Sequence, residues 1–319
     1  DNMMLTAGKK GFSMPHHNEA GETYIPKEHT LTAWTAQRAI SYLRSQHKGP
    51  FSLTCSILHP HALLIAAPPY LRMFDPAKMP VPANLYHDME GQGSRRPVPG
   101  AVPLTPEGLG SFIALYYGLV AEVDHWVGQL LRALKDSGHE QNTLVIFTAD
   151  HGEMMGSHGT FSKGNFYEEA FRVPFILRLP GRIKAGLRLD TPASGMDLMP
   201  TILDYCGLGD QAGHCHGISL RPAVEGKKFN RPFSYGELGR SDRAKRSIRT
   251  NNTKFVLAGS DDAHLYDLKN DPGEQHNLLL EKNRKPAHVD LAKKLRLEIQ
   301  AYLEGQGDPA YKNLPEIEI

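Results

Sequence analysis

The sequence predicts an α/β protein, in which a mostly parallel sheet carries helices on both faces and a small α+β subdomain follows. Over the first two thirds of the chain, short apolar runs alternate with amphipathic segments, as strands and helices do around a parallel sheet. After Pro232 this order gives way to short strand-like runs and a polar helix. We therefore expect an α/β domain over residues 1–230, and a subdomain with short antiparallel strands and a helix over residues 231–319.

The N-terminal third is predicted to contain one helix and one strand. Residues 1–27 show no hydrophobic period and are expected to form a loop. Leu31–Ser45 has the pattern of a helix, and a Gly-Pro pair follows it as a stop signal. Phe51–Leu58 is expected to be a strand. Pro68–Pro106 is rich in proline and glycine, which predicts a long loop of the kind that often carries function.

One long helix and two buried strands are predicted for the middle of the chain. Apolar residues recur at spacings of three and four over Ile113–Leu134, which predicts a helix with one buried face. Leu144–Phe147 and Val173–Leu177 are short apolar runs between turn signals, which is typical of strands in a parallel sheet. A further helix is expected near Asp197–Tyr205, with Pro200 in its first turn.

The C-terminal part is predicted to form a small sheet and a helix. Asn-Asn and Ser-Asp-Asp turns separate three strand-like runs, at Arg246–Thr250, Lys254–Leu257 and His264–Leu268. A polar helix is expected from about His288 to Leu303.

The composition excludes some partners. The 36 basic and 35 acidic residues give a net charge of +1, so there is no electrostatic footprint for nucleic acid or a membrane surface. No apolar stretch approaches the roughly 20 residues of a membrane span. Three cysteines do not make a disulfide framework. Composition leaves the oligomeric state undetermined.

The most informative pattern lies around the first of the two middle strands. Asp150 and His151 directly follow Leu144–Phe147, at the strand end where ligands collect in parallel sheets. A carboxylate and an imidazole side by side can coordinate a cation. Lys163 follows in a glycine-flanked loop and can neutralise an anion bound to that cation. The local pattern indicates a metal-assisted site for an oxyanion ester.

Four segments resemble the sulfatases of the alkaline phosphatase-like superfamily, and they occur in the family's order and spacing. Thr143–Arg178 closely resembles the second metal-binding segment of that family. Phe51–Tyr70 is similar to the sulfatase strand that ends in a Pro-His pair, and Ser194–Gly207 to the segment before the C-terminal subdomain. Leu265–Leu278 matches the family's late signature. The resemblance implies the alkaline phosphatase-like fold.

The resemblance also implies roles for individual residues. Asp150 and His151 would be ligands of a divalent metal, with calcium the first expectation. Manganese and zinc are alternatives, because an imidazole suits them better than it suits calcium. Calcium-type sulfatases often have asparagine where this chain has His151, whereas phosphonate monoester hydrolases and many sulfatase relatives have histidine there. Lys163 would contact the sulfate group and take part in catalysis.

Histidines supply the remaining candidates for the site. His61 matches the family residue that acts near the leaving alcohol, as a general acid or a hydrogen-bond donor. His59 lies two residues earlier and would point the same way in an extended strand, so it is a candidate for substrate binding. His158, in the loop before Lys163, is a second such candidate. Tyr167, Glu168, Glu169 and Arg172 match the family's Y-E-x-x-x-R pattern, and we expect Arg172 and the glutamates to hold the loop by ion pairs.

Several family elements are missing from the sequence. None of the three cysteines, and no serine, lies in a formylglycine motif of the C-x-P-S-R or C-x-A-x-R type. The first metal-binding Asp-Asp pair is also absent. We expect an incomplete chain from a normal enzyme, with a shortened, inactive relative as the alternative. Residues 1–319 alone are therefore expected to hydrolyse no sulfate ester.

The sequence as a whole predicts a sulfuric ester hydrolase that acts on a small-molecule or glycan sulfate ester. Two alternatives remain open, a phosphate or phosphonate monoester hydrolase of the same superfamily and a non-catalytic sulfatase-like binding protein. The resemblance implies a periplasmic, extracellular or lysosomal protein, and the localisation is left unknown. The loop Pro68–Pro106 is the expected source of specificity.

Overall fold

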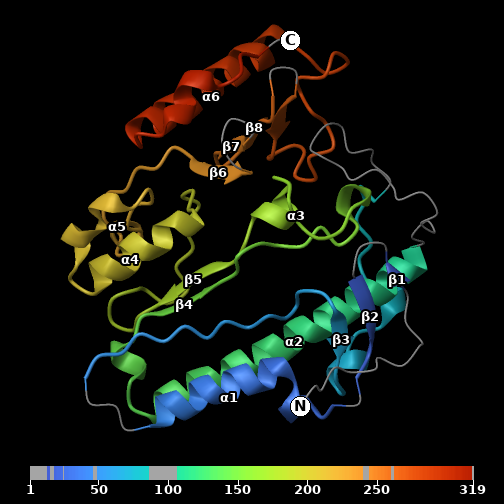
Figure 1. Ribbon diagram of the computed structural model, residues 1–319, viewed down its shortest axis with the longest axis vertical. Helices are drawn as coiled ribbons and strands as arrows, with labels where there is room; N and C mark the ends of the chain where they lie inside the picture. Colours follow the sequence, from blue (N-terminus) through green and yellow to red (C-terminus); the bar gives the residue numbers. More distant parts are fainter. Residues whose placement is uncertain are drawn as a thin grey trace. The chain divides into compact units, whose positions relative to one another are not determined.

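The computed structural model describes residues 13–14, 18–23, 25–45, 49–85, 106–239, 244–259 and 262–317 (Figure 1). The chain divides into two compact units. Unit 1 comprises residues 1–83 and 95–143, and unit 2 comprises residues 84–94 and 144–319. The boundary that we predict at residue 230 lies inside unit 2, and it stays a prediction. Part of the long loop predicted over Pro68–Pro106 lies outside the described residues.

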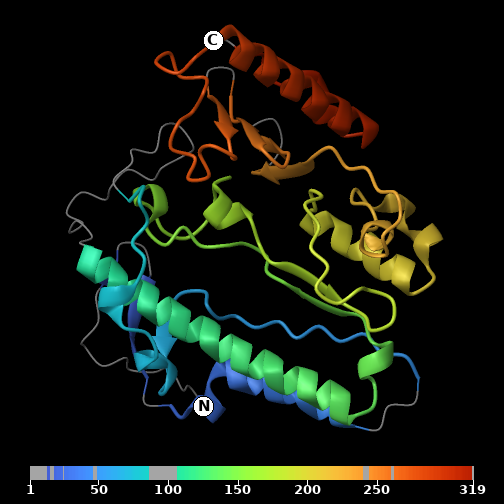
Figure 2. The same cartoon turned by 180° about the vertical axis from the view of Figure 1, so that it is seen from behind.

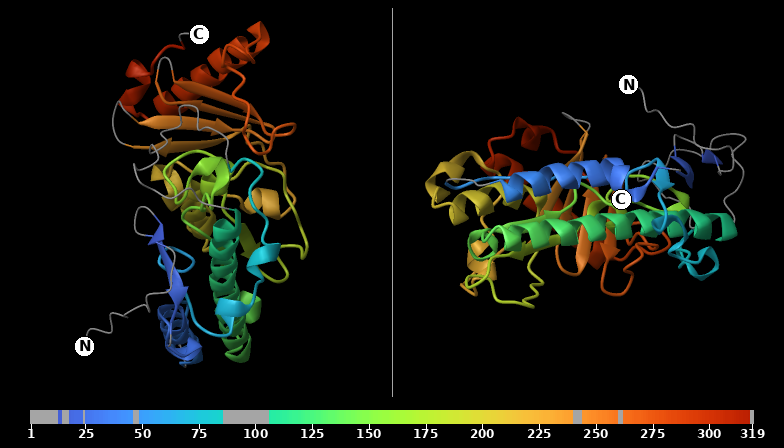
Figure 3. Two further views of the ribbon diagram at one scale, coloured as in Figure 1. Left: turned by 90° about the vertical axis from the view of Figure 1, so that its right-hand side faces the viewer. Right: turned by 90° about the horizontal axis from the view of Figure 1, so that it is seen from below.

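Two helices form the centre of unit 1. Helix α1, Leu31–Arg44, begins at Thr30, whose hydroxyl accepts a hydrogen bond from the Ala33 N–H at 3.1 Å. This is an ordinary N-cap, which satisfies a backbone donor that the helix cannot. Helix α2, Pro106–Asp136, lies alongside α1 in the views of Figure 2 and Figure 3. Both helices confirm the sequence prediction, and α2 begins earlier than the apolar period alone indicates.

A small sheet completes unit 1 and corrects two predictions. Strands β1 (Ser13–Met14) and β2 (Asn18–Glu22) are antiparallel, and β2 pairs in parallel with β3 (Leu64–Ala66). The loop predicted for residues 1–27 therefore contains strands. Phe51–Leu58 is extended but belongs to no strand of the described structure. An apolar, β-branched pattern favours extended backbone, whereas a strand also needs a partner that no local pattern specifies.

Unit 2 contains the strands that flank the predicted site. Strand β4, Val145–Thr148, pairs with β5, Phe175–Arg178, in antiparallel register. The expected mostly parallel sheet is thus wrong for this pair, although the α/β class is confirmed. A parallel pair needs a crossover, usually a long helix. Here the connection contains only one turn of 3-10 helix, Ser157–Gly159, and the four-residue helix α3, Glu168–Phe171, and the chain returns beside β4 in the opposite direction.

The rest of unit 2 is an antiparallel sheet with helices. Its strands lie in the order β6 (Ser234–Leu238), β7 (Lys245–Arg249), β8 (Thr253–Leu257) and β9 (Ala263–Asp267). Helix α6 (Pro286–Gly305) supplies apolar side chains to a core shared with the sheet. That core contains Ile248, Phe255, Leu265 and Ile299, none of which exposes any surface. Strand β6 is an addition to the three strands that we predict. Two short helices, α4 (Leu198–Tyr205) and α5 (Arg221–Val224), precede this sheet in the sequence.

None of the helices that the structure describes is long and apolar enough to span a bilayer. Short 3-10 helices occupy several connections. They lie at Lys27–His29, Tyr70–Arg72, Pro76–Lys78, Glu140–Asn142, Ser157–Gly159, Gly195–Asp197, Gly209–His214 and Pro309–Asn313.

Candidate active site

Asp150 and His151 emerge immediately after β4, as the sequence predicts. The Asp150 side chain is 88% exposed, and its Oδ1 accepts the His151 backbone N–H at 3.0 Å. Its other oxygen, Oδ2, lies 3.6 Å from His151 Nε2. A carboxylate oxygen and an imidazole nitrogen at this separation can share one cation.

A backbone contact fixes which ring nitrogen of His151 carries the hydrogen and which holds the lone pair. Nδ1 lies 2.8 Å from the Gly152 carbonyl oxygen. A carbonyl only accepts, so Nδ1 carries the hydrogen, and in the neutral ring Nε2 holds the lone pair. Metal-binding histidines commonly have this arrangement, in which the second nitrogen donates to a carbonyl. The pair therefore fits two ligands of a divalent metal. Among the described residues, no third histidine, cysteine, aspartate or glutamate joins this pair, and no group of three or more such side chains gathers at any other place.

Gly152 explains the glycine that follows the Asp-His pair. Its N–H donates to the Ala170 carbonyl at 2.8 Å. A Cβ atom on residue 152 would lie only 1.9 Å from the Glu169 carbonyl oxygen. Glycine is required here because the backbone of α3 passes against the end of the Asp-His segment.

Residues 153–162, which we call the site loop, bring Lys163 back toward the start of the loop. The Met154 N–H donates to the Ser162 carbonyl at 3.0 Å, and the Gly156 N–H to the Thr160 carbonyl at 2.9 Å. These two bonds close the loop much as a hairpin closes. Asp150, His151 and Lys163 consequently line the same cleft of unit 2.

Glu153 is a residue of the site that our sequence reasoning missed. Its Oε1 accepts the N–H groups of Ser162 and, at 3.4 Å, of Met155. Burial raises the pKa of this carboxyl, although the backbone donors and the charges of His151 and Lys163 oppose the rise. Only its place beside the Asp-His-Gly segment could have suggested a role, because glutamate is common in loops.

His158 packs inside unit 2. It is only 2% exposed, and its ring stacks on Tyr167 with a centroid distance of 3.7 Å and an interplanar angle of 14°. Its φ of 52° is left-handed, which is unusual for a residue with a side chain. The predicted contact with substrate stays a prediction, and the geometry favours a packing role.

His59 and His61 belong to unit 1, where their surroundings differ. His61 is exposed and, like His151, has Nδ1 2.8 Å from the carbonyl oxygen of the next residue. His59 Nδ1 lies 2.8 Å from Thr32 Oγ1 and 3.2 Å from Glu122 Oε2. The Glu122 side chain is fully buried, and Thr30 donates to it at 2.5 Å. His59 is thus tied to both long helices, and the expectation that both histidines bind one substrate stays a prediction.

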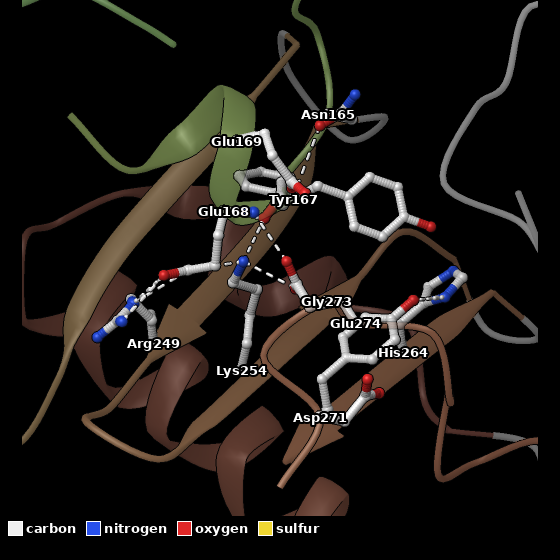
Figure 4. A network of polar contacts seen from close by, with 12 residues as sticks. Asn165, Tyr167, Glu168, Glu169, Arg249, Lys254, His264, Asp271, Gly273 and Glu274 are labelled. Atoms are coloured by element: carbon white, nitrogen blue, oxygen red, sulfur yellow. Dashed lines mark hydrogen bonds and ion pairs between the residues drawn. The ribbon is translucent and has the colours of Figure 1, made fainter. Parts of the chain in front are cut away.

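A buried charge network supports the segment after Lys163 (Figure 4). Lys254 of β8 has no exposed side-chain surface, and its Nζ lies 2.6 Å from the Phe166 carbonyl oxygen. The same nitrogen lies 2.8 Å from a carboxylate oxygen of Glu168 and of Glu274. Glu274 Oε2 also accepts the Glu168 N–H at 2.7 Å. The network joins α3 to the C-terminal sheet.

Glu168 forms ion pairs, as the sequence predicts. Its carboxylate binds Lys254 and, through two nitrogens, Arg249, both from the C-terminal sheet. The sequence pattern does not identify these partners, because they lie on strands distant in sequence that pack against α3. Burial alone would raise the pKa of Glu168, yet Arg249 and Lys254 lower it to about 2. Burial dominates at Glu274 and raises its pKa to about 7.

Comparison with known proteins shows the family of this chain. The sulfatase family model matches residues 4–208, and the model of the N-sulphoglucosamine sulphohydrolase C-terminal region matches residues 156–301. The fold and the site segment thus define a member of the alkaline phosphatase-like superfamily. Within it, the chain belongs to the sulfatase family.

Individual relatives are longer than this chain. An arylsulfatase of Clostridium perfringens is 32% identical over 289 residues, which cover 87% of this chain and 59% of the relative. The solved phosphonate monoester hydrolase of Agrobacterium radiobacter has a TM-score of 0.76 and 28% identity, covering 90% of this chain and 62% of its own. The putative sulfatase yidJ of Bacteroides fragilis has a TM-score of 0.74 and 26% identity, covering 89% and 60%. The chain therefore spans about three fifths of these proteins.

Proposed function

We propose that this chain contributes to a sulfuric ester hydrolase in which Asp150 and His151 are two ligands of a divalent metal. The observation that carries the proposal is the 3.6 Å approach of Asp150 Oδ2 to His151 Nε2, next to a loop that returns to Lys163. Calcium is the first expectation for the metal, with manganese or zinc as alternatives. When bound, the metal supplies positive charge for the ester oxygens.

The side chains of this chain have separate tasks in the proposed reaction. Lys163 neutralises charge on the sulfate oxygens, and it does so best in the transition state, where that charge grows. His61 donates a proton or a hydrogen bond to the leaving alcohol. The proposed nucleophile is a formylglycine, as in the family. Residues 1–319 contain no motif for it, so we propose this chemistry only for a protein in which such a segment accompanies them.

The relatives support a sulfated glycan or small sulfate ester as substrate. Two of them are named N-acetylglucosamine-6-O-sulfatase and endo-4-O-sulfatase, both from Bacteroides thetaiotaomicron. In addition, a solved structure that is 26% identical to this chain contains D-glucosamine-2-N,6-O-disulfate as its substrate. We propose the same class of ester for this chain, without choosing between sugar and aryl alcohols.

A phosphonate or phosphate monoester is the second candidate substrate. His151 fits it, because phosphonate monoester hydrolases, like many sulfatase relatives, have histidine where calcium-type sulfatases often have asparagine. Two such hydrolases have TM-scores of 0.76 and 0.77 with this structure. A non-catalytic binding protein is the third candidate function. The presence of Asp150, His151 and Lys163 argues against it.

Hydrolysis assays distinguish these three candidate functions. They use the protein purified from the cells that make it. We expect turnover of 4-nitrophenyl sulfate with added calcium or manganese, and a lower rate with 4-nitrophenyl phenylphosphonate. Asp150→Asn should lower the rate by about 100-fold or more. The exposed Asp210 provides the matched control, because Asp210→Asn removes a carboxylate elsewhere on unit 2. Faster phosphonate turnover would favour the second candidate, and no turnover of either ester would favour the third.

A further inference from the structure

Glu153 differs from the other carboxylate of the Asp-His segment. Asp150 is exposed to solvent, whereas the Glu153 side chain turns into its own loop and accepts two backbone N–H groups. Neither the proposed metal pair nor the proposed chemistry uses it. A partly buried carboxylate in such a place needs a compensating role, because burial of its charge is unfavourable without hydrogen bonds.

The bond from Ser162 gives Glu153 a specific place in the loop. Ser162 has a φ of 69°, a left-handed conformation that a serine adopts at a cost in free energy. This conformation turns its N–H toward the Glu153 carboxylate, which accepts it. Removing the carboxylate would leave that N–H without this acceptor and weaken the left-handed turn.

The residue after this turn is Lys163. Residue 153 lies two positions after His151, and residue 162 lies one position before Lys163. The contact between Glu153 and Ser162 therefore joins the metal pair to the sulfate-contacting lysine across ten residues of loop.

We propose that Glu153 is a positioning residue, which fixes Lys163 relative to Asp150 and His151 by holding Ser162 in its left-handed turn. The inference rests on the proposed function, because it assumes that Lys163 binds the anionic group of the substrate. Glu153 itself touches neither substrate nor metal. The loss of Glu153 should therefore act through Lys163 and through no other contact.

Inorganic sulfate binding to the 319-residue chain tests this in a double-mutant cycle, followed by NMR titration of the lysine side chains. Glu153→Ala and Lys163→Ala should each weaken sulfate binding by about tenfold, the loss of roughly one charge-assisted contact. The double variant should bind no more than about twofold more weakly than Lys163→Ala, because the two residues act as one unit. Independent effects, which multiply to about 100-fold, would overturn the proposal.

Two further variants separate positioning from general damage to the loop. Glu153→Gln keeps an oxygen acceptor for the Ser162 N–H and should retain affinity within about threefold. Glu169 accepts from the Ser157 hydroxyl at 2.5 Å, so Glu169→Ala removes a different carboxylate contact of the same loop and is the matched control. It should leave sulfate affinity within about twofold of wild type. Equal losses in Glu169→Ala and Glu153→Ala would overturn the proposal.

Amide hydrogen exchange decides the same question without any ligand. Glu153→Ala should increase exchange of the Ser162 and Lys163 amides at least about tenfold, with α6 unchanged. Unchanged exchange at both amides would overturn the proposal, whether or not sulfate binds. If the purified protein hydrolyses neither ester while the exchange and sulfate results hold, the proposed function fails and the positioning role of Glu153 stands.

Discussion

Replacing Lys254 with methionine removes the charge at the centre of the buried network and keeps an unbranched side chain that is one atom shorter. The ammonium is fully buried and has three oxygen neighbours at 2.6 to 2.8 Å, from Phe166, Glu168 and Glu274. Glu168 would retain Arg249, whereas Glu274 would lose its ion pair with Lys254. Breaking such a buried pair costs about 3–5 kcal/mol. We therefore expect Lys254→Met to lower the free energy of unfolding of unit 2 by about 3–5 kcal/mol at pH 8.

The pH dependence of this loss identifies its cause. Glu274 can take up a proton in the Lys254→Met variant, which removes the uncompensated charge. The destabilisation should therefore fall by about 1–2 kcal/mol between pH 8 and pH 5.5. Both tryptophans, Trp34 and Trp126, lie in unit 1, so their fluorescence reports on that unit.

Hydrogen exchange of the β8 amides provides the measurement for unit 2. The matched control is Lys227→Met, because Lys227 is 67% exposed and pairs with Glu225 at 3.5 Å. An exposed pair contributes at most about 1 kcal/mol. The reasoning would be refuted if Lys254→Met cost no more than Lys227→Met, or if its cost were the same at pH 5.5 and pH 8.

Three further predictions concern single residues. Gly152→Ala should destabilise the Asp-His segment by about 2 kcal/mol or more, because its Cβ would meet the Glu169 carbonyl, and exchange of the His151 amide should rise accordingly. The folded-state pKa of Glu274 is raised from 4.5 to about 7, so its contribution to stability is fully present below pH 4.5 and is lost as pH rises through 7. Glu274→Gln should remove that slope, about 1–3 kcal/mol between pH 5 and pH 8 in urea unfolding. In an active protein, His61→Ala should slow alkyl sulfates more than aryl sulfates, since a basic leaving alcohol needs protonation most; equal losses would exclude the acid role.

Local patterns predicted the helices and most of the C-terminal sheet, because their information lies within one element. The spacing of apolar residues in α2 and the turns between β7, β8 and β9 need no partner to be recognised. Pairing is different. The antiparallel return of β5 beside β4 depends on how the site loop folds, and Phe51–Leu58 has the composition of a strand without strand pairing in the described structure.

The site divides in the same way. Asp150, His151 and Lys163 could be selected as candidates from their residue types and spacing, and the structure places them along one cleft, whereas their chemical roles stay predictions. The supporting residues could not, since their partners lie far away in sequence: Lys254 binds the Phe166 carbonyl across 88 positions. Glu153 acts within its own loop, yet only the left-handed turn at Ser162 reveals the bond, and no residue pattern predicts that turn.

The buried network around Lys254 also constrains how this sequence can vary. Glu168 and Glu274 are separated by 106 positions, yet one N–H bond and one shared ammonium join them. A neutral residue at position 254 would be tolerated best together with a neutral residue at position 274, so the two sites should change together among relatives. A chimera that takes its last hundred residues from a relative carries the relative's residues at positions 254 and 274. It should fold well only when those two residues suit the recipient's residue at position 168.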